Sequence, residues 1–328
     1  MQAPRTRVQR RPVHGVLLLD KPLGLSSNDA LQKAKWLLRA EKAGHTGTLD
    51  PLASGVLPLC FGAATKFSQL QLDADKTYEA TLRLGQKTST GDAEGQVIAE
   101  RPVAVTPAQV AAVQHQFMGA IRQIPPMYSA LKKDGKALYE YARAGQEVER
   151  LARDVQIKAL NLALAPDTPA QQAIEMIVTC SKGTYIRTLG EDIGEALGCG
   201  GHLTRLRRVA TGHFRVDGAI ALDALEALDE PARLARLLPV ESLLADHMPV
   251  TLAGEDAGRF LSGVRRRGAW ADSGRVAVFG ASPRALLGTA RAKAGELIPG
   301  RLLSPIEIQQ ILENTHGAAA VPCTKEAL

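Results

Sequence analysis

The pattern of apolar and polar positions predicts strands in several segments of the chain. Residues 13–19 form an unbroken apolar run typical of a buried strand, whereas residues 76–84 alternate apolar and polar positions, as a half-buried strand does. Two further apolar stretches, at 154–165 and 173–181, have the length and composition of strands.

Other segments show the three- or four-residue spacing of amphipathic helices. This spacing predicts helices over 28–40 and 186–197, the second ending before Gly198. Thr106 and Gln109 form a capping box, with a proline at the first helical position, and predict a third helix. Because strands and helices come in mixed order, the pattern favours an α+β fold with a mixed, largely antiparallel central sheet.

Changes in composition predict two domains and two tails. Residues 1–12 carry four arginines and no apolar run, so we expect a basic, disordered tail. A main domain is expected over 13–247, and its segment 222–248 resembles a connection. Short strands separated by Gly and Pro predict a small β domain over 248–313, which ends in a short helix. The Ala-rich segment 314–328 is expected to be disordered.

Length and charge narrow the class of protein. A chain of 328 residues exceeds the size at which one core usually stops growing, and its net charge of +6 favours a polyanionic partner, of which nucleic acid is the commonest. No apolar run approaches the length of a membrane span, and the N-terminus lacks the apolar region of a secretory signal. We therefore expect a cytoplasmic protein without a membrane association.

Cysteine spacing offers little support for a metal site. Cys60, Cys180, Cys199 and Cys323 form no CxxC pair and are expected to be reduced thiols. Cys199 and His202 have a spacing that could ligate zinc, but no second pair completes the set of about four ligands. Because dinucleotide and phosphate-loop fingerprints are missing too, we expect neither a metal nor a cofactor.

Asp50 is the first candidate for chemistry. It lies in the run 44–58, which is rich in Gly, Pro and apolar residues, and the run is too apolar to solvate a carboxylate freely. An ordinary Asp-Pro turn also explains this composition, and by composition alone the turn is the better interpretation.

The order of several motifs changes that balance. Six segments accompany the Asp50 run: 19–28 (LDKPLGLSSN), 62–66 (GAATK), 76–80 (KTYEA), 125–132 (PPMYSALK), 183–189 (GTYIRTL) and 202–208 (HLTRLRR). Together they resemble, in the same order, the motifs of the TruB family of bacterial tRNA pseudouridine synthases. The resemblance covers about residues 13–215. It implies the pseudouridine synthase fold, and the pattern of the last domain resembles a small β-barrel RNA-binding domain of the PUA type.

The resemblance implies an activity and its residues. The family isomerises uridine 55 in the T arm of tRNA to pseudouridine, and Asp50 matches its catalytic aspartate, acting at C6 of the base or at the ribose. Arg187 matches an arginine that pairs with this carboxylate. Tyr78 matches a catalytic tyrosine beside the uracil. The matching residues expected to bind substrate are His45, which fills the gap left by the extruded base, and Tyr185, Leu206, Lys21 and Lys66.

Clustered cations are expected to hold the RNA backbone. They lie in the segment 125–150, which resembles the family's insertion that closes over the T loop, in a second cluster near residue 206 and in the last domain. They are Lys132, Lys133, Lys136, Arg143, Arg205, Arg207, Arg208, Arg265, Arg266 and Arg267. We expect a monomer that needs no protein partner; the alternatives are a guide-RNA-dependent synthase and a non-catalytic protein that binds or folds tRNA.

Overall fold

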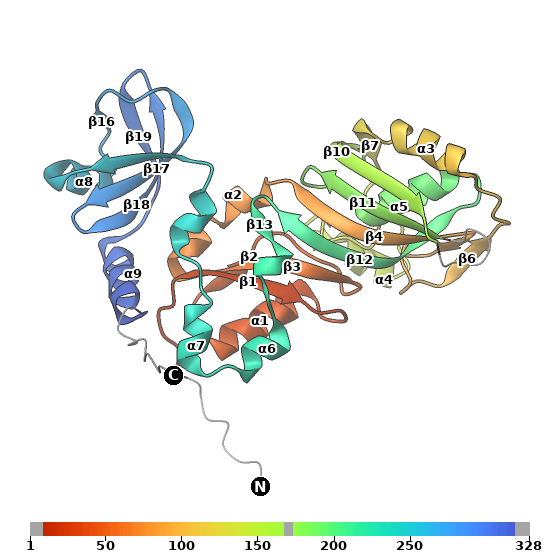
Figure 1. Ribbon diagram of the computed structural model, residues 1–328, viewed down its shortest axis with the longest axis horizontal. Coiled ribbons are helices and arrows are strands. Elements are labelled where there is room, and N and C mark those ends of the chain that lie inside the picture. Colours follow the sequence, from red (N-terminus) through yellow and green to blue (C-terminus); the bar gives the residue numbers. More distant parts are fainter. Residues whose placement is uncertain (1–8, 167–172, 319–328) are drawn as a thin grey trace, which may run out of the picture.

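The computed structural model describes residues 9–166 and 173–318, without the side chains of residues 314–318. It has a large domain, built on a ten-stranded sheet, and a smaller C-terminal domain, built on a five-stranded sheet (Figure 1). Three short helical segments, from the end of the large sheet to the start of the small one, connect them.

The large sheet is mixed and largely antiparallel, as the sequence predicts. Its main path runs in the order β14 (Ile220–Ala221), β1 (Gly15–Lys21), β3 (Ala53–Phe61), β12 (Gly201–Thr211), β4 (Lys76–Leu84), β11 (Ala173–Cys180), β10 (Arg153–Leu164) and β7 (Gly119–Gln123). Off this path, β2 (Ala43–His45) pairs with β3 and β13 (Phe214–Arg215) with β12. Only the pairs β1–β14 and β3–β12 of this sheet are parallel.

Helices cover the large sheet where its apolar side chains need burial. The main ones are α1 (Ser27–Leu37), α3 (Pro107–Gln116) and α5 (Ile186–Ala196). The domain also contains the shorter segments η1 (Gly62–Lys66), α2 (Ser68–Leu72), α4 (Leu138–Arg143) and η3 (Val216–Gly218). The capping box predicted at the start of α3 is present. Two small hairpins, β5–β6 (Gln86–Thr88, Val97–Glu100) and β8–β9 (Lys132–Lys133, Lys136–Ala137), complete the domain.

Strand β1 shows why its sequence is apolar throughout. Leu17 and Leu19 point into the main core beside α1, while Val16 and Leu18 point into a second core on the opposite face of the sheet. This second core includes Phe279 of the C-terminal domain, so the two domains share buried apolar surface.

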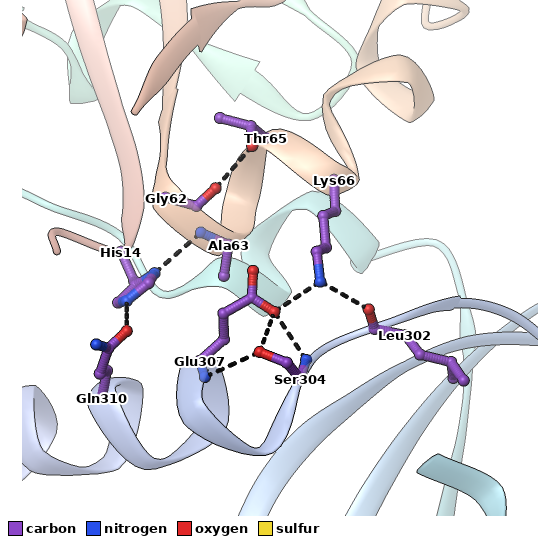
Figure 2. Close-up of polar contacts among 9 residues, drawn as sticks. All are labelled: His14, Gly62, Ala63, Thr65, Lys66, Leu302, Ser304, Glu307 and Gln310. Atoms are coloured by element: carbon purple, nitrogen blue, oxygen red, sulfur yellow. Dashed lines mark hydrogen bonds and ion pairs between the residues drawn. The ribbon is translucent and has the colours of Figure 1, made fainter. Parts of the chain in front are cut away.

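The C-terminal sheet has the order β15 (Met248–Leu252), β17 (Ser273–Ala281), β18 (Arg284–Lys293), β19 (Glu296–Leu302) and β16 (Arg266–Arg267). Helix α8 (Gly254–Leu261) packs against it, and α9 (Pro305–Ala318) runs from it to the large domain (Figure 1). At this junction the ammonium of Lys66 pairs with Glu307 at 2.6 Å, and His14 lies between the amide of Ala63 and the side chain of Gln310, 2.9 Å from each (Figure 2).

Segment 222–248, expected to be a connection, contains α6 (Leu222–Ala227), α7 (Glu230–Ala235) and η4 (Val240–Leu244), whose apolar residues are buried in both cores. Three expectations about the chain's organisation need correction. Helix α1 ends at Leu37 rather than near residue 40, because Arg39 adopts a left-handed φ of 52°.

The tails also differ from expectation where they are described. Arg11 is held by an ion pair with Glu230 at 2.7 Å and by backbone hydrogen bonds, so order begins before residue 13. Helix α9 continues to Ala318, beyond the point at which we expected disorder. Residues 1–8 and 319–328 of the expected tails lie outside the described residues.

We predict that Gly55→Ala strongly destabilises the fold. Gly55 has φ +107°, and an added Cβ would lie 2.2 Å from the carbonyl oxygen of Arg208 on the paired strand. The free energy of unfolding should fall by about 3 kcal/mol or more, measured by denaturant unfolding. Gly44→Ala is the matched control, because its Cβ would meet nothing within 4 Å, and should change the value by about 0.5 kcal/mol at most. Equal unfolding midpoints for the two variants would contradict this account.

Candidate active site

The loop that joins β2 to β3 carries Asp50 to the edge of a deep pocket. The pocket has a volume of about 920 Å³ and is lined by the ends of α1, β4, α5 and β12 and by the segment around residue 130. Of the catalytic and substrate-binding residues predicted from the sequence, six line it: His45, Asp50, Tyr78, Tyr185, Arg187 and Leu206. Residues more than 150 positions apart in sequence therefore meet in one cavity.

Asp50 and Arg187 form an ion pair in the wall of the pocket. A guanidinium nitrogen of Arg187 lies 2.8 Å from Oδ2 of Asp50. The Arg187 side chain is only 5% exposed, whereas that of Asp50 is 40% exposed, so our expectation of a poorly solvated aspartate is wrong. The guanidinium is therefore the buried partner, and the carboxylate is the partner that is open to solvent at the pocket.

Arg187 is fixed from three further directions. Its terminal nitrogens donate to the backbone carbonyls of Thr90 at 3.0 Å and Tyr128 at 2.7 Å. Its Nε lies 3.5 Å from the carboxylate of Asp92, which is itself buried and accepts a hydrogen bond from the amide of Glu94. Because Arg187 and Asp92 are both buried, the guanidinium is held in one position. It therefore fixes the orientation of Asp50.

Asp92 is a site residue that the sequence analysis missed. It lies in the turn 88–95, between β5 and β6, where the pattern of apolar residues gives no signal and the sequence resembles any polar turn. Only the fold, which brings this turn to the start of α5, shows that the carboxylate of Asp92 lies near Arg187.

Two tyrosines form part of the pocket wall. Burial raises the pKa of Tyr78 on β4, although the guanidinium of Arg208 opposes this effect. Burial also raises the pKa of Tyr185, which directly precedes α5. Gln123, at the end of β7, holds the backbone of Tyr185. Its side-chain Nε2 donates to the carbonyl of Tyr185 at 3.3 Å, and its Oε1 accepts a hydrogen bond from the backbone N–H of Tyr185 at 3.1 Å.

His45 ends β2 at the pocket margin. Burial, followed by the nearby charge of Arg208, lowers the pKa of its imidazole. Its Nδ1 is buried without a hydrogen-bond partner among the described residues. Leu206 of β12 supplies a buried apolar wall of the same cavity.

Two lysines predicted to bind substrate lie elsewhere. Lys21 is fully buried, its ammonium donates to the carbonyls of Pro22 and Leu25, and desolvation lowers its pKa to about 8. Lys66 is paired with Glu307 at the domain junction (Figure 2). Neither side chain lines the pocket, because each is committed to acceptors of its own.

The arginines near residue 206 have three different surroundings. Arg205 is exposed beside Glu79, whereas Arg207 forms a two-pronged contact with the carboxylate of Asp20 at 2.7 and 3.1 Å. Arg208 is 1% exposed and lines the pocket from below, so it is not a surface contact for an RNA backbone.

The remaining predicted cations lie on two surfaces. In the segment 125–150, Lys132 is exposed, Lys133 donates to the carbonyl of Glu149, and Lys136 and Arg143 lie over the rings of Tyr141 and Tyr139. Arg143 and Tyr139 also line the pocket.

On the C-terminal domain, Arg265 and Arg267 share Glu296 and are 61% and 88% exposed. Arg266 differs from them, because it pairs with Asp256 and is mostly buried. Two of the three arginines thus present their charge to solvent.

Within the described ranges, no cluster of three or more His, Cys, Asp or Glu residues has a geometry suited to a metal. His202 instead contacts the carbonyl of Gln86 at 3.0 Å. Cys60, Cys180 and Cys199 are buried free thiols, and Cys323 lies outside the described residues.

Among the residues that the structure describes, no helix is long and apolar enough to cross a membrane.

Two solved structures with a similar fold define the class of this fold. The chain superimposes on one described as "Crystal Structure of a Cbf5-Nop10-Gar1 Complex" with a TM-score of 0.68 and 25% identity, covering 90% of this chain and 86% of that one. A second, "Structure of H/ACA RNP bound to a substrate RNA containing 2'-deoxyuridine", gives a TM-score of 0.66 at 22% identity over 89% and 86% of the two chains. The fold is that of a pseudouridine synthase.

Sequence comparison identifies the family. The model of the TruB family pseudouridylate synthase N-terminal domain matches residues 35–186, and that of the tRNA pseudouridylate synthase B C-terminal domain matches residues 187–245. The chain is 66% identical to tRNA pseudouridine synthase B of Verminephrobacter eiseniae, over 94% of this chain and 95% of that protein. It is 61% identical to the enzyme of the same name from Cupriavidus pinatubonensis, over 90% and 96%. The chain belongs to the TruB family.

We predict that Asp92→Asn weakens the fold around Arg187. The change removes the buried carboxylate that faces Arg187, so that only the 40% exposed Asp50 still pairs with this buried guanidinium. The free energy of unfolding should therefore fall by about 3 kcal/mol, measured by denaturant unfolding. Asp154→Asn is the control, because Asp154 is 88% exposed and lies 3.7 Å from Arg122; its effect should be below about 1 kcal/mol. If the two variants were equally stable, Asp92 would not be a support of Arg187.

Proposed function

We propose that this chain converts uridine 55 in the T arm of tRNA to pseudouridine, with Asp50 as the catalytic carboxylate. The chain is a TruB family tRNA pseudouridine synthase, an isomerase. The observation that carries the finer assignment is the ion pair of Asp50 with buried Arg187, with Asp50 open to the pocket.

The reaction explains why the site needs such an anion. The bond from C1′ to N1 breaks, the uracil turns, and a new bond joins C1′ to C5, with no net exchange of electrons. Asp50 supplies the carboxylate that acts on the substrate, and its ion pair with Arg187 keeps it directed towards the pocket. Its exposed fraction of 40% leaves the carboxylate accessible to a nucleotide.

The walls of the pocket suit a uracil ring that is free for part of the reaction. Tyr185 and Leu206 offer flat and apolar surface for the base, and we assign to Tyr78 the removal of the proton from C5. Such a base must leave the stack of the T arm before it can enter the pocket. His45, at the pocket margin with a lowered pKa, is a neutral ring suited to filling the gap that the base leaves.

Cations on both domains favour binding of the whole T arm by one chain. The segment 125–150 brings Arg143 to the pocket and exposes Lys132 beside it, and the smaller domain exposes Arg265 and Arg267. We propose that 13–247 is the catalytic domain and 248–313 a PUA-like RNA-binding domain.

We propose a cytoplasmic monomer that acts without guide RNA or protein partner. Tyr139 and Arg143, which line the pocket, come from this chain's own segment 125–150, and that supports a standalone enzyme. The guide-RNA-dependent alternative predicts instead that purified protein leaves free tRNA unmodified.

We predict that Asp50→Asn abolishes turnover but keeps tRNA binding. The amide retains the shape of the side chain but can act neither as a nucleophile nor as a base. Phosphate contacts on many residues should hold the affinity within about tenfold of the parent, or roughly 1.4 kcal/mol. The measurement is release of tritium from C5 of uridine in unmodified tRNA, with chemical mapping of the modified position.

The variant must be shown to be folded by thermal unfolding, because Arg187 loses its partner, and Asp154→Asn serves as a surface control for the loss of a carboxylate. Pseudouridine formation by folded Asp50→Asn at the parent rate would remove Asp50 from the mechanism.

We predict that replacing Arg265 and Arg267 together by glutamine weakens tRNA binding and flattens its salt dependence. The slope of log affinity against log salt should fall by at most about 0.9 for each phosphate that the variant no longer binds. The single-turnover rate with bound tRNA should be unchanged. Arg259→Gln is the comparison, since Arg259 lies on α8 of the same domain, outside the 265–267 cluster, and pairs with Glu255 within that helix. A reduced rate with unchanged affinity would place this surface in the catalytic site.

A further inference from the structure

Arg208 is a buried cation without a carboxylate partner among the described residues. Its side chain is among the largest that are fully buried, with an exposure of 1%. Among the residues that the structure describes, no carboxylate lies within ion-pair distance of it. Burying a guanidinium without a counter-ion is costly, even when its donors are satisfied by carbonyls.

The contacts of Arg208 connect it to the catalytic loop. Its Nε donates to the carbonyl of Val56 at 2.8 Å, and a terminal nitrogen lies 3.4 Å from the carbonyl of Gly47. These two residues flank Asp50 in the chain, and the arginine lines the same pocket. Its position is therefore defined by the segment that carries the catalytic carboxylate.

Tyr78 is the cross-strand neighbour of Arg208. The two residues are directly paired in the antiparallel register of β4 and β12, and both line the pocket. Burial raises the pKa of the Tyr78 phenol, and the charge and hydrogen bonding of Arg208 act in the opposite direction. The other charged or titratable groups that act on Tyr78 are Cys180 on β11 and Asp50, and both favour the protonated phenol.

We propose that Arg208 is a positioning residue for Tyr78, whose phenolate it stabilises for removal of the C5 proton. The inference rests on the proposed function, in which Tyr78 takes that proton. A buried cation that has no carboxylate partner and lies beside a buried phenol finds its counter-charge when the phenolate forms. The cost of burying Arg208 is then offset in the state that reacts.

Protons and electrons balance in this step. The phenol loses its proton to water at the open pocket, and the phenolate forms beside Arg208. After C1′ has joined C5, the ring holds a C6=N1 double bond and C5 still carries its hydrogen. The phenolate oxygen takes the C5 proton, the electron pair of the C5–H bond forms the C5=C6 double bond, and the π pair of the C6=N1 bond moves to N1. Solvent supplies the proton that N1 gains, so the overall change remains an isomerisation.

The test uses Arg208→Gln and tRNA with deuterium at C5 of the target uridine. Loss of the cation should slow C5 proton removal by about 10²-fold in single-turnover reactions, and a larger primary isotope effect than in the parent should appear. Because the phenol then loses its stabilising cation, the rate should keep rising with pH where that of the parent has levelled. A role confined to the fold or to Asp50 would slow the earlier steps and leave no isotope effect.

Arg208→Lys keeps the charge and should slow the reaction less, with the same isotope signature. It carries the test if Arg208→Gln does not fold, as judged by thermal unfolding. In a Tyr78→Phe background, Arg208→Gln should change the rate by less than about threefold, because Arg208 acts through the phenol.

With an active parent enzyme, either of two results would overturn the inference. One is that the effects of Arg208→Gln and Tyr78→Phe are fully additive, and the other is that the Arg208 variants are slow but show no isotope effect. A parent enzyme that forms no pseudouridine would instead refute the proposed function.

Discussion

Burial of positive charge beneath the pocket is the constraint on which the active site depends. Lys76, Arg187 and Arg208 line the pocket and are each at least nine-tenths buried, and each directs its donors at backbone carbonyls of neighbouring segments. A buried cation without acceptors would be very costly, so each cation holds the segment whose carbonyls it binds. Because buried ion pairs rarely add net stability, this concentration of charge around one cavity is better explained by the chemistry of an anionic site. Asp50 completes the arrangement as a partner that is substantially open to the pocket.

The smaller domain is held to the larger one by both apolar and polar contacts. Phe279 enters the second core, and the pair of Lys66 with Glu307 is only partly exposed (Figure 2). This junction explains why a lysine from a family motif lies outside the pocket. It also fixes the exposed arginines of the C-terminal domain relative to the loop that carries Asp50.

The sequence by itself determined the elements with strong local patterns. The alternation in β4, the capping box of α3 and the apolar run of β1 depend on side-chain spacing and local hydrogen bonds, and the structure has each of them. The family motifs likewise led to Asp50, Tyr78 and Arg187, because these residues occur in distinctive local strings. Short helices such as η4 were missed, since five residues show too little periodicity to be distinguished from a loop.

Only the tertiary structure decided which charges are buried and which partners they meet. Arg207 and Arg208 are adjacent in sequence, yet successive side chains of a strand point to opposite faces, so one contacts Asp20 and the other lies below the pocket. Asp92 comes from an unremarkable turn and becomes a support of Arg187 only because the sheet brings that turn to the start of α5. Burial and counter-ions arise from contacts between distant segments, and a local sequence pattern does not encode them directly.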